Sequence, residues 1–455
     1  MKKPFGWAAL AFVVIVTVVL AWGLSGHDPD TRFSGAYALP DDSFLYISPE
    51  GHDRLRFRTL SGQSGLLWRS AANHFEGGNG FAQREPVFHR FEFDLDSSDE
   101  ATGLVWEQPG VAPVRAPRVR LDEQPATFQS GDVRLRGKLV MPEGGRQLPA
   151  VLFIDGWKRT SAVDHAFEPY LYASRGFATL VFDTRGTGKS TGEYTQNFRV
   201  LATDALAALK WLRDQPRIDA TNVHLVGVAE GGWIAPMAAA RDANVRSVLV
   251  CHGPLVSAFE QDRWSYVSAL RRSGFDDAAI AEADHINAIL GDIVDRRIDR
   301  WDDFAQALKE ARGRPWFPAI EDSHSLFGEL AHSSLPLWAM RLKVASSLND
   351  EPAFIDRLYD PLPTAAALKS PSYWILAEQD SSMPTDWTIE ALNKLQRQRK
   401  PVDYLLYPDA EHGSLRIEQR ADGSRKLLGY EPDYFKVQID WLKRNSGPRL
   451  EMEST

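Results

Sequence analysis

Residues 223–241 read VHLVGVAEGGWIAPMAAAR, and the fold can be deduced outward from this stretch. The apolar run at 223–226 predicts a buried strand, and the segment 233–241 predicts a helix. Between them, the small residues at 227–232 permit a sharp strand-to-helix turn. The tip of such a turn projects one side chain above the sheet, beside the positive end of the helix dipole. In this chain the tip is Ala229.

The flanking segments repeat the alternation of strand and helix. Short apolar runs are typical of strands buried on both faces of a parallel sheet, and they occur at 150–154, 178–182 and 245–250. Helix-like segments at 165–175 and 204–213 lie between them, and 133–140 alternates as a strand does. This order predicts an α/β sheet built from right-handed crossover units.

Two later segments place polar side chains at the ends of predicted strands. The buried run at 373–377 is followed by Glu378-Gln379-Asp380, which can present a carboxylate. The run at 404–407 is followed by a loop that contains His412. The chain therefore presents, in this order, a turn tip, an acid and an imidazole, which is the order in which one class of hydrolases places nucleophile, acid and histidine.

Composition and the remaining motifs exclude several classes of function. With 455 residues and a formal charge of −9, the chain has no basic surplus for nucleic acid. The single cysteine, Cys251, cannot form an internal disulfide and is expected to be a core thiol, and no Cys/His spacing resembles a zinc site. We expect neither a metal nor an organic cofactor. Residues 183–190 end in Gly-Lys-Ser but lack the first glycine of a phosphate-binding loop, so they predict a structural turn.

Residues from about 117 to 445 resemble the α/β-hydrolase superfamily, in particular its dienelactone-hydrolase-like and serine-aminopeptidase-like esterases and peptidases. The resemblance implies a mostly parallel sheet flanked by helices. It rests on the turn around Ala229 and on further motifs in the family's order: Ile154-Asp155-Gly156, residues 183–192, residues 359–363, Asp380 with Met383-Pro384, and His412-Gly413.

The resemblance also implies a Ser-His-Asp mechanism that hydrolyses a small-molecule ester, amide or peptide. Asp380 would hold His412 in its productive tautomer, and His412 would act as general base and then as general acid. The backbone N–H groups of Trp157 and Glu230 would form an oxyanion hole, in which each donor lowers the barrier by roughly 3 kcal/mol.

Ala229 departs from the family at the attacking atom, because a methyl group cannot form an acyl-enzyme intermediate. Three explanations stay open: an engineered Ser→Ala substitution that traps substrate, a natural loss that leaves a pseudoenzyme, and a natural change with repurposed chemistry. Water activated by His412 could still give slow hydrolysis. The alternative function is that of a non-catalytic envelope binding protein that uses the same cleft.

Three further regions complete the predicted organisation. Residues 5–24 are apolar except for Thr17 and follow Lys2 and Lys3, and a helix of this length would cover the ~30 Å core of a bilayer. We expect 1–26 to be a signal anchor or signal peptide. The globular part would then lie on the periplasmic side of the inner membrane, or be secreted if the segment is cleaved.

Alternating runs within 30–115 predict a small antiparallel β domain, which precedes the hydrolase domain at 117–445. Within that domain, about 255–358 is expected to form a helical lid rich in aromatic residues, and 446–455 form a tail.

Overall fold

A computed structural model describes residues 29–156, 159–321, 323, 325–349, 356–420 and 425–447. The predicted N-terminal anchor, residues 1–26, lies outside the described residues. Among the described residues, no helix combines the length and the apolar character needed to cross a bilayer. The prediction of a membrane anchor therefore remains an expectation.

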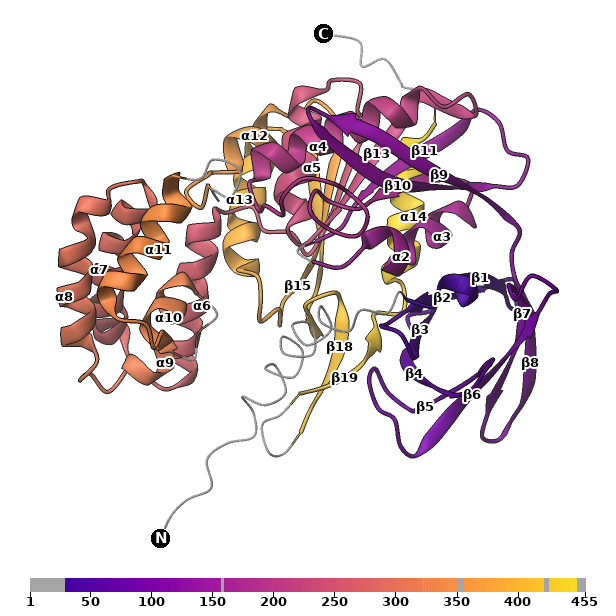
Figure 1. The fold of residues 1–455 in the computed structure, drawn as a ribbon, viewed down its shortest axis with the longest axis horizontal. Helices are drawn as coiled ribbons and strands as arrows, with labels where there is room; N and C mark the ends of the chain where they lie inside the picture. Colours follow the sequence, from indigo (N-terminus) through magenta and orange to yellow (C-terminus); the bar gives the residue numbers. More distant parts are fainter. Residues whose placement is uncertain are drawn as a thin grey trace.

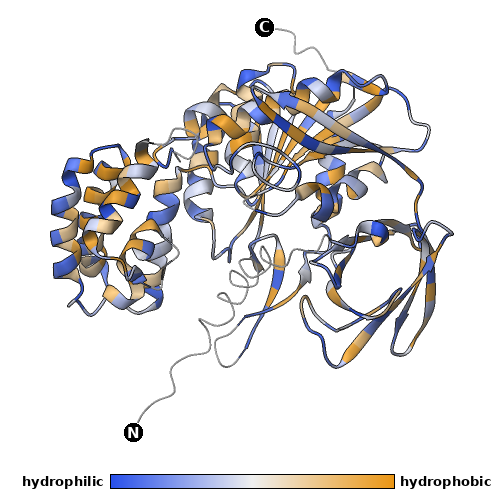
Figure 2. Ribbon diagram, in the orientation of Figure 1, coloured by the Kyte–Doolittle hydropathy of each residue, from blue (hydrophilic) through white to orange (hydrophobic). Residues whose placement is uncertain are grey.

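The central sheet has eight strands in the order β16-β15-β14-β13-β11-β12-β10-β9. Strands β11 to β16 run parallel, whereas β10 is antiparallel to both β12 and β9. Figure 2 shows how the apolar residues concentrate in these strands. The bounds are β9 (Leu121–Ser130), β10 (Val133–Pro142), β11 (Leu148–Ile154), β12 (Ala178–Phe182), β13 (Ile218–Val228), β14 (Val248–Cys251), β15 (Ser372–Ala377) and β16 (Val402–Tyr407).

Helices cover both faces of this sheet (Figure 1). One face packs against α4 (Phe198–Arg213), α5 (Gly231–Arg241), α12 (Leu362–Ala367) and α13 (Thr385–Arg397). The other face packs against α2 (Ala162–His165), α3 (Glu168–Ala173) and α14 (Tyr434–Asn445). Strand order, direction and helix placement together form the α/β-hydrolase fold expected from the sequence.

Helix boundaries differ from the periodicity-based expectation in two places. Helix α4 begins at Phe198 rather than near 204, because the Asn197 side chain accepts hydrogen bonds from the Arg199 and Val200 N–H groups and caps the helix. The single helix expected at 165–175 is divided into α2 and α3. The intervening Ala166 is in the extended region, which ends α2.

The N-terminal β domain is a meander in which each strand pairs with the next, β1 through β8. An isolated bridge between Tyr37 and Arg118 brings its first strand next to the end of its last, and Figure 1 shows the sheet rolled up on itself. The inside of this roll is filled by a buried cluster rich in phenylalanine. A short η1 turn (Thr31–Phe33) precedes β1 (Gly35–Ala38), β2 (Phe44–Pro49), β3 (Arg54–Thr59), β4 (Ser64–Ala71), β5 (His74–Gly78), β6 (Val87–Leu95), β7 (Ala101–Gln108) and β8 (Val111–Pro117).

The insertion between β14 and β15 is helical and has a hydrophobic core of its own. Its elements are α6 (Ala258–Arg272), α7 (Asp277–Val294), η2 (Ile298–Arg300), α8 (Trp301–Ala311), α9 (Phe317–Glu321), α10 (Leu326–His332) and α11 (Leu337–Asn349). Figure 1 places this body beside α13, at one end of the sheet. Helix α6 links it to the loop that carries Asp380, because Gln261 Nε2 donates to the Ser382 carbonyl at 2.8 Å.

A three-stranded sheet follows β16 and carries the imidazole loop. It comprises β17 (Ala410–Glu411), β18 (Leu415–Gln419) and β19 (Arg425–Tyr430). Figure 1 shows the β18–β19 hairpin next to β3 and β4 of the N-terminal domain. His412 lies between β17 and β18, so the loop that carries it is held between the central sheet and the β domain.

Candidate active site

The turn at the end of β13 has the geometry that its small residues predict. Ala229 is in the left-handed region, with φ of 49°, and its N–H donates to the Cys251 carbonyl at 2.9 Å. A Cβ on Gly227 would lie 2.2 Å from the Gly231 carbonyl oxygen, and one on Gly232 would lie 2.6 Å from the Gly253 Cα. Only glycine fits at both positions. The two glycines allow the tight elbow, at whose tip the Ala229 methyl lies.

Asp380 and His412, predicted to act as a pair, are in direct contact. The Nδ1 atom of His412 lies 2.8 Å from Asp380 Oδ2. Asp380 Oδ1 accepts from the N–H groups of Ser382 and Met383, which fixes a carboxylate whose side chain is only 2% exposed. The His412 side chain is 31% exposed and remains accessible from solvent.

Charge around the imidazole favours its protonated form. Burial opposes protonation of His412, but the carboxylates of Asp380 and Glu411 outweigh it, so the pKa of His412 is raised above its usual 6.5. A hydrogen bond from Nδ1–H to Asp380 leaves Nε2 as the atom that can take or give a proton.

The elbow and the imidazole both lie next to residues at the end of β14. The Ala229 N–H is hydrogen-bonded to the carbonyl of Cys251, which is the last residue of that strand, and His252 follows immediately. The ring centroid of His252 lies 5.5 Å from that of His412, with the planes at 64°. The structure therefore brings Asp380 and His412 into hydrogen-bond contact and places the His412 ring beside His252, the residue that follows the acceptor of the Ala229 N–H.

The loop after β11 passes over the elbow, as an oxyanion loop requires. A Cβ on Gly156 would lie 3.1 Å from both the Ala229 Cβ and the Val228 carbonyl oxygen. Trp157, which the sequence predicted as an oxyanion donor, lies outside the described residues. The predicted partner donor, the Glu230 N–H, belongs to the residue directly after the elbow tip.

The Glu230 side chain has an environment that the sequence did not reveal. It is only 8% exposed, and Gln196 Nε2 donates to its Oε2 at 3.1 Å. Burial, reinforced by the negative charge of Asp155, outweighs the Gln196 hydrogen bond and raises the pKa of the Glu230 carboxyl to about 7. A carboxyl that is partly protonated at neutral pH therefore lies beside the elbow.

His252 is the second feature that sequence reasoning missed. It is 1% exposed, has a left-handed φ of 55°, and its Nε2 lies 3.0 Å from the Tyr434 hydroxyl. Burial, together with the charge of His412, lowers the pKa of His252 well below its usual value. Its position one residue beyond a buried parallel strand is the signal that could have placed it at this edge of the sheet.

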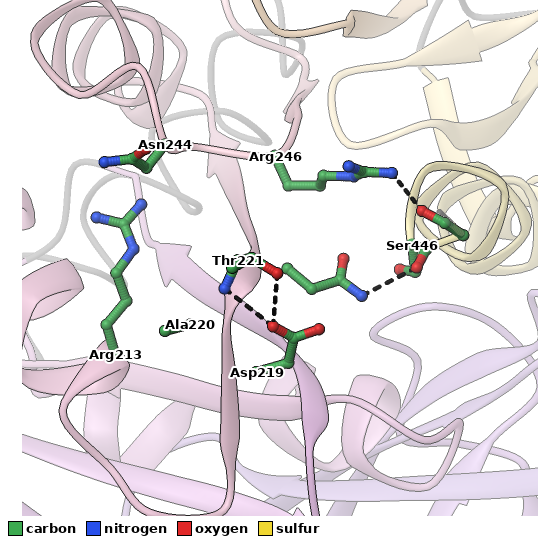
Figure 3. A pocket seen from close by; sticks show the side chains of 9 residues that line it. Arg213, Asp219, Ala220, Thr221, Asn244, Arg246 and Ser446 are labelled. Atoms are coloured by element: carbon green, nitrogen blue, oxygen red, sulfur yellow. Dashed lines mark hydrogen bonds between the residues drawn. The ribbon is translucent and has the colours of Figure 1, made fainter. Parts of the chain in front are cut away.

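A cavity of about 770 Å³ lies elsewhere, near the amino ends of β13 and β14 (Figure 3). Two arginines in its lining already have protein partners. Arg213 pairs with Asp242, and Arg246 Nε donates to the Asn445 carbonyl at 2.7 Å. This cavity is remote from the carboxyl ends of the strands and plays no part in the candidate site.

Within the described ranges, no group of three or more His, Cys, Asp or Glu residues is arranged to hold a metal ion.

Comparison with known proteins points to hydrolases. Residues 130–414 match the family model described as X-Pro dipeptidyl-peptidase (S15 family). The chain is 31% identical over 129 residues to thiohydrolase aneE of Aspergillus aculeatus, covering 28% of this chain and 39% of that protein. It is 27% identical over 178 residues to quorum-quenching protein AidA of Acinetobacter baumannii, covering 38% of this chain and 56% of that protein. The matches thus span about half or less of these curated relatives.

Among solved structures, the chain is similar to the esterase Pf2001 of Pyrococcus furiosus. The two are 16% identical with a TM-score of 0.43, and the similarity covers 72% of this chain and 92% of that one.

Proposed function

Since the chain belongs to the X-Pro dipeptidyl-peptidase (S15) family of α/β-hydrolases, we propose that its site is built to hydrolyse a carboxylic ester or a small amide or peptide. The observation that carries this proposal is the 2.8 Å contact between His412 Nδ1 and Asp380, beside an elbow that presents position 229. This arrangement supplies an oriented base and a fixed acid where the reacting carbonyl would bind.

In the proposed mechanism, Asp380 accepts from His412 Nδ1–H and so keeps Nε2 free as general base. The Glu230 N–H, with Trp157 N–H as its expected companion, stabilises the oxyanion of the tetrahedral intermediate. With serine at position 229, Nε2 would take the hydroxyl proton during attack and return it to the leaving group. With Ala229 no acyl-enzyme forms, and Nε2 can only activate water, which leaves roughly 10³-fold catalysis over the uncatalysed reaction.

The helical body formed by α6 to α11 is proposed to act as the lid of this site, since α6 is bonded to the loop that carries Asp380. The apolar run at 5–24 is proposed to be a signal anchor or signal peptide. The globular part would then lie on the outer side of the inner membrane, or be secreted if the segment is cleaved.

The Ala229 methyl group favours one second candidate, a binding protein that holds a carbonyl ligand in the same cleft without turnover. Both candidates use the same oxyanion donors, and they differ only in whether a bond is broken.

The experiment compares the full chain with Ala229→Ser, using p-nitrophenyl esters and aminoacyl-arylamides. Ala229→Ser/His412→Gln serves as the matched control, because it has the hydroxyl but lacks the base. Activity that appears with serine and disappears in the control supports the hydrolase site. Inactivity of every folded form favours the binding protein, and rapid turnover by the Ala229 protein would refute the mechanism.

A further inference from the structure

The imidazole of His412 is backed by a second, neutral imidazole. His252 is 1% exposed, and its ring meets that of His412 at 64°, an edge-to-face arrangement. The backbone of His252 is fixed on both sides, since its N–H donates to the Ile375 carbonyl at 2.9 Å and the next residue, Gly253, packs on the elbow helix. Its φ of 55° lies in the left-handed region, which is strained for a residue other than glycine.

Tyr434 fixes the orientation of the His252 ring. Its hydroxyl lies 3.0 Å from His252 Nε2, and both side chains are buried. Burial raises the pKa of the Tyr434 hydroxyl well above its usual value, so the hydroxyl keeps its proton and stays available for this hydrogen bond. His252 Nδ1 has no hydrogen-bond partner within the described part of the chain, so Tyr434 is the polar contact that sets the ring.

Tyr434 is in turn held by the N-terminal β domain through Tyr430. The two tyrosine rings stack with centroids 5.7 Å apart and planes at 3°. The Tyr430 N–H donates to the Gly62 carbonyl at 2.8 Å, and a Cβ on Gly62 would lie 2.5 Å from the backbone carbonyl oxygen of Tyr430. The β3–β4 loop therefore docks directly on the backbone that precedes α14.

We propose that His252 and Tyr434 are positioning residues that hold the His412 imidazole against Asp380, and that the N-terminal β domain supports them through Tyr430. This inference rests on the proposed function for its catalytic meaning. A displacement of a reacting group by about 1 Å can cost on the order of 100-fold in rate, so a rigid backing for the base has a direct effect on turnover.

The test uses the full chain labelled with ¹⁵N in histidine, with the His412 resonances assigned by their loss in His412→Gln. Tyr434→Phe removes only the hydroxyl, and His252→Asn removes the ring but tolerates the left-handed backbone. Tyr266→Phe is the matched control, because it removes the hydroxyl of another buried tyrosine, hydrogen-bonded to Asp284, in the helical body.

We expect Tyr434→Phe and His252→Asn to shift the titration of His412 and broaden its Nδ1–H resonance, and Tyr266→Phe to leave both unchanged. In the Ala229→Ser background, kcat should fall by roughly tenfold or more while KM changes less than about twofold. Gly62→Ala, in the other domain, should shift the same resonance.

Each result bears on a separate part of the proposal. If His412 titrates as in the unmodified protein in both Tyr434→Phe and His252→Asn, the positioning role is overturned. If His252→Asn does not fold, Tyr434→Phe decides. If only Gly62→Ala has no effect, the support from the β domain is overturned. If Ala229→Ser is inactive, the proposed function fails while the resonance of His412 still decides the positioning role.

Discussion

Replacing Glu230 by glutamine should stabilise the protein, and more so as the pH rises. The folded chain holds this carboxyl with a pKa of about 7, whereas its ordinary value is 4.5. The folded state therefore binds the proton more tightly, and it loses stability as the pH rises from about 4.5 through 7. The difference between these values corresponds to about 3 kcal/mol at about 1.4 kcal/mol per pH unit. Since the side chain is only 8% exposed, solvent screening reduces this figure little.

Glutamine keeps the shape and can still accept from Gln196 but carries no charge, so Glu230→Gln removes this penalty. The assay is the difference in Tm between variant and parent at about pH 5 and about pH 8. We expect a small difference at the lower pH and a rise on the order of 5 °C at the higher pH. Glu390→Gln, at an exposed position on α13, is the matched control and should show no such trend. Equal Tm differences for Glu230→Gln at both pH values would refute the reasoning.

Three further predictions follow from single contacts. In the Ala229→Ser background, Asp380→Asn should lower kcat by roughly 10⁴-fold without loss of folding, because the imidazole then adopts the wrong tautomer; a fall of less than tenfold in the ester assay would contradict this role. Gly62→Ala should lower the free energy of unfolding by roughly 2 kcal/mol or more, whereas Gly131→Ala, which has a similar positive φ but open space around it, should cost about 1 kcal/mol in the same denaturation assay. Cys251 is fully buried, and burial raises its thiol pKa to about 12, so a maleimide should label it only on unfolding; rapid labelling of the folded chain would exclude this environment.

The parts of the fold that local sequence determines could be predicted. Buried parallel strands need wholly apolar runs, and the elbow needs its small residues, so the segment around Ala229 was readable without coordinates. The chain order of Asp380 and His412 suggested that they would meet, because parallel strands deliver their carboxyl ends to one edge of the sheet.

Contacts between distant segments could not be predicted in the same way. The docking of Gly62 on Tyr430 joins residues 368 positions apart. A glycine in a hairpin turn and a tyrosine at the end of a strand are both common, so neither residue indicates the contact. His252 was equally hidden, since a histidine after a buried strand has many roles. The Gln196 side chain that donates to the buried Glu230 carboxyl comes from a loop that precedes α4.

The costs to stability at this edge of the sheet are concentrated around position 229. Ala229 and His252 both have a positive φ, which costs each of them about 1 kcal/mol or more, and Glu230 buries an acid next to the charge of Asp155. Such costs persist only where the surrounding packing enforces them, and here the glycines of the elbow and the Tyr434 hydroxyl do so. The scaffold therefore enforces a strained backbone around position 229, which carries a methyl group where the proposed mechanism needs a hydroxyl. This is why restoring one hydroxyl, rather than rebuilding the site, is the decisive test between a hydrolase and a binding protein.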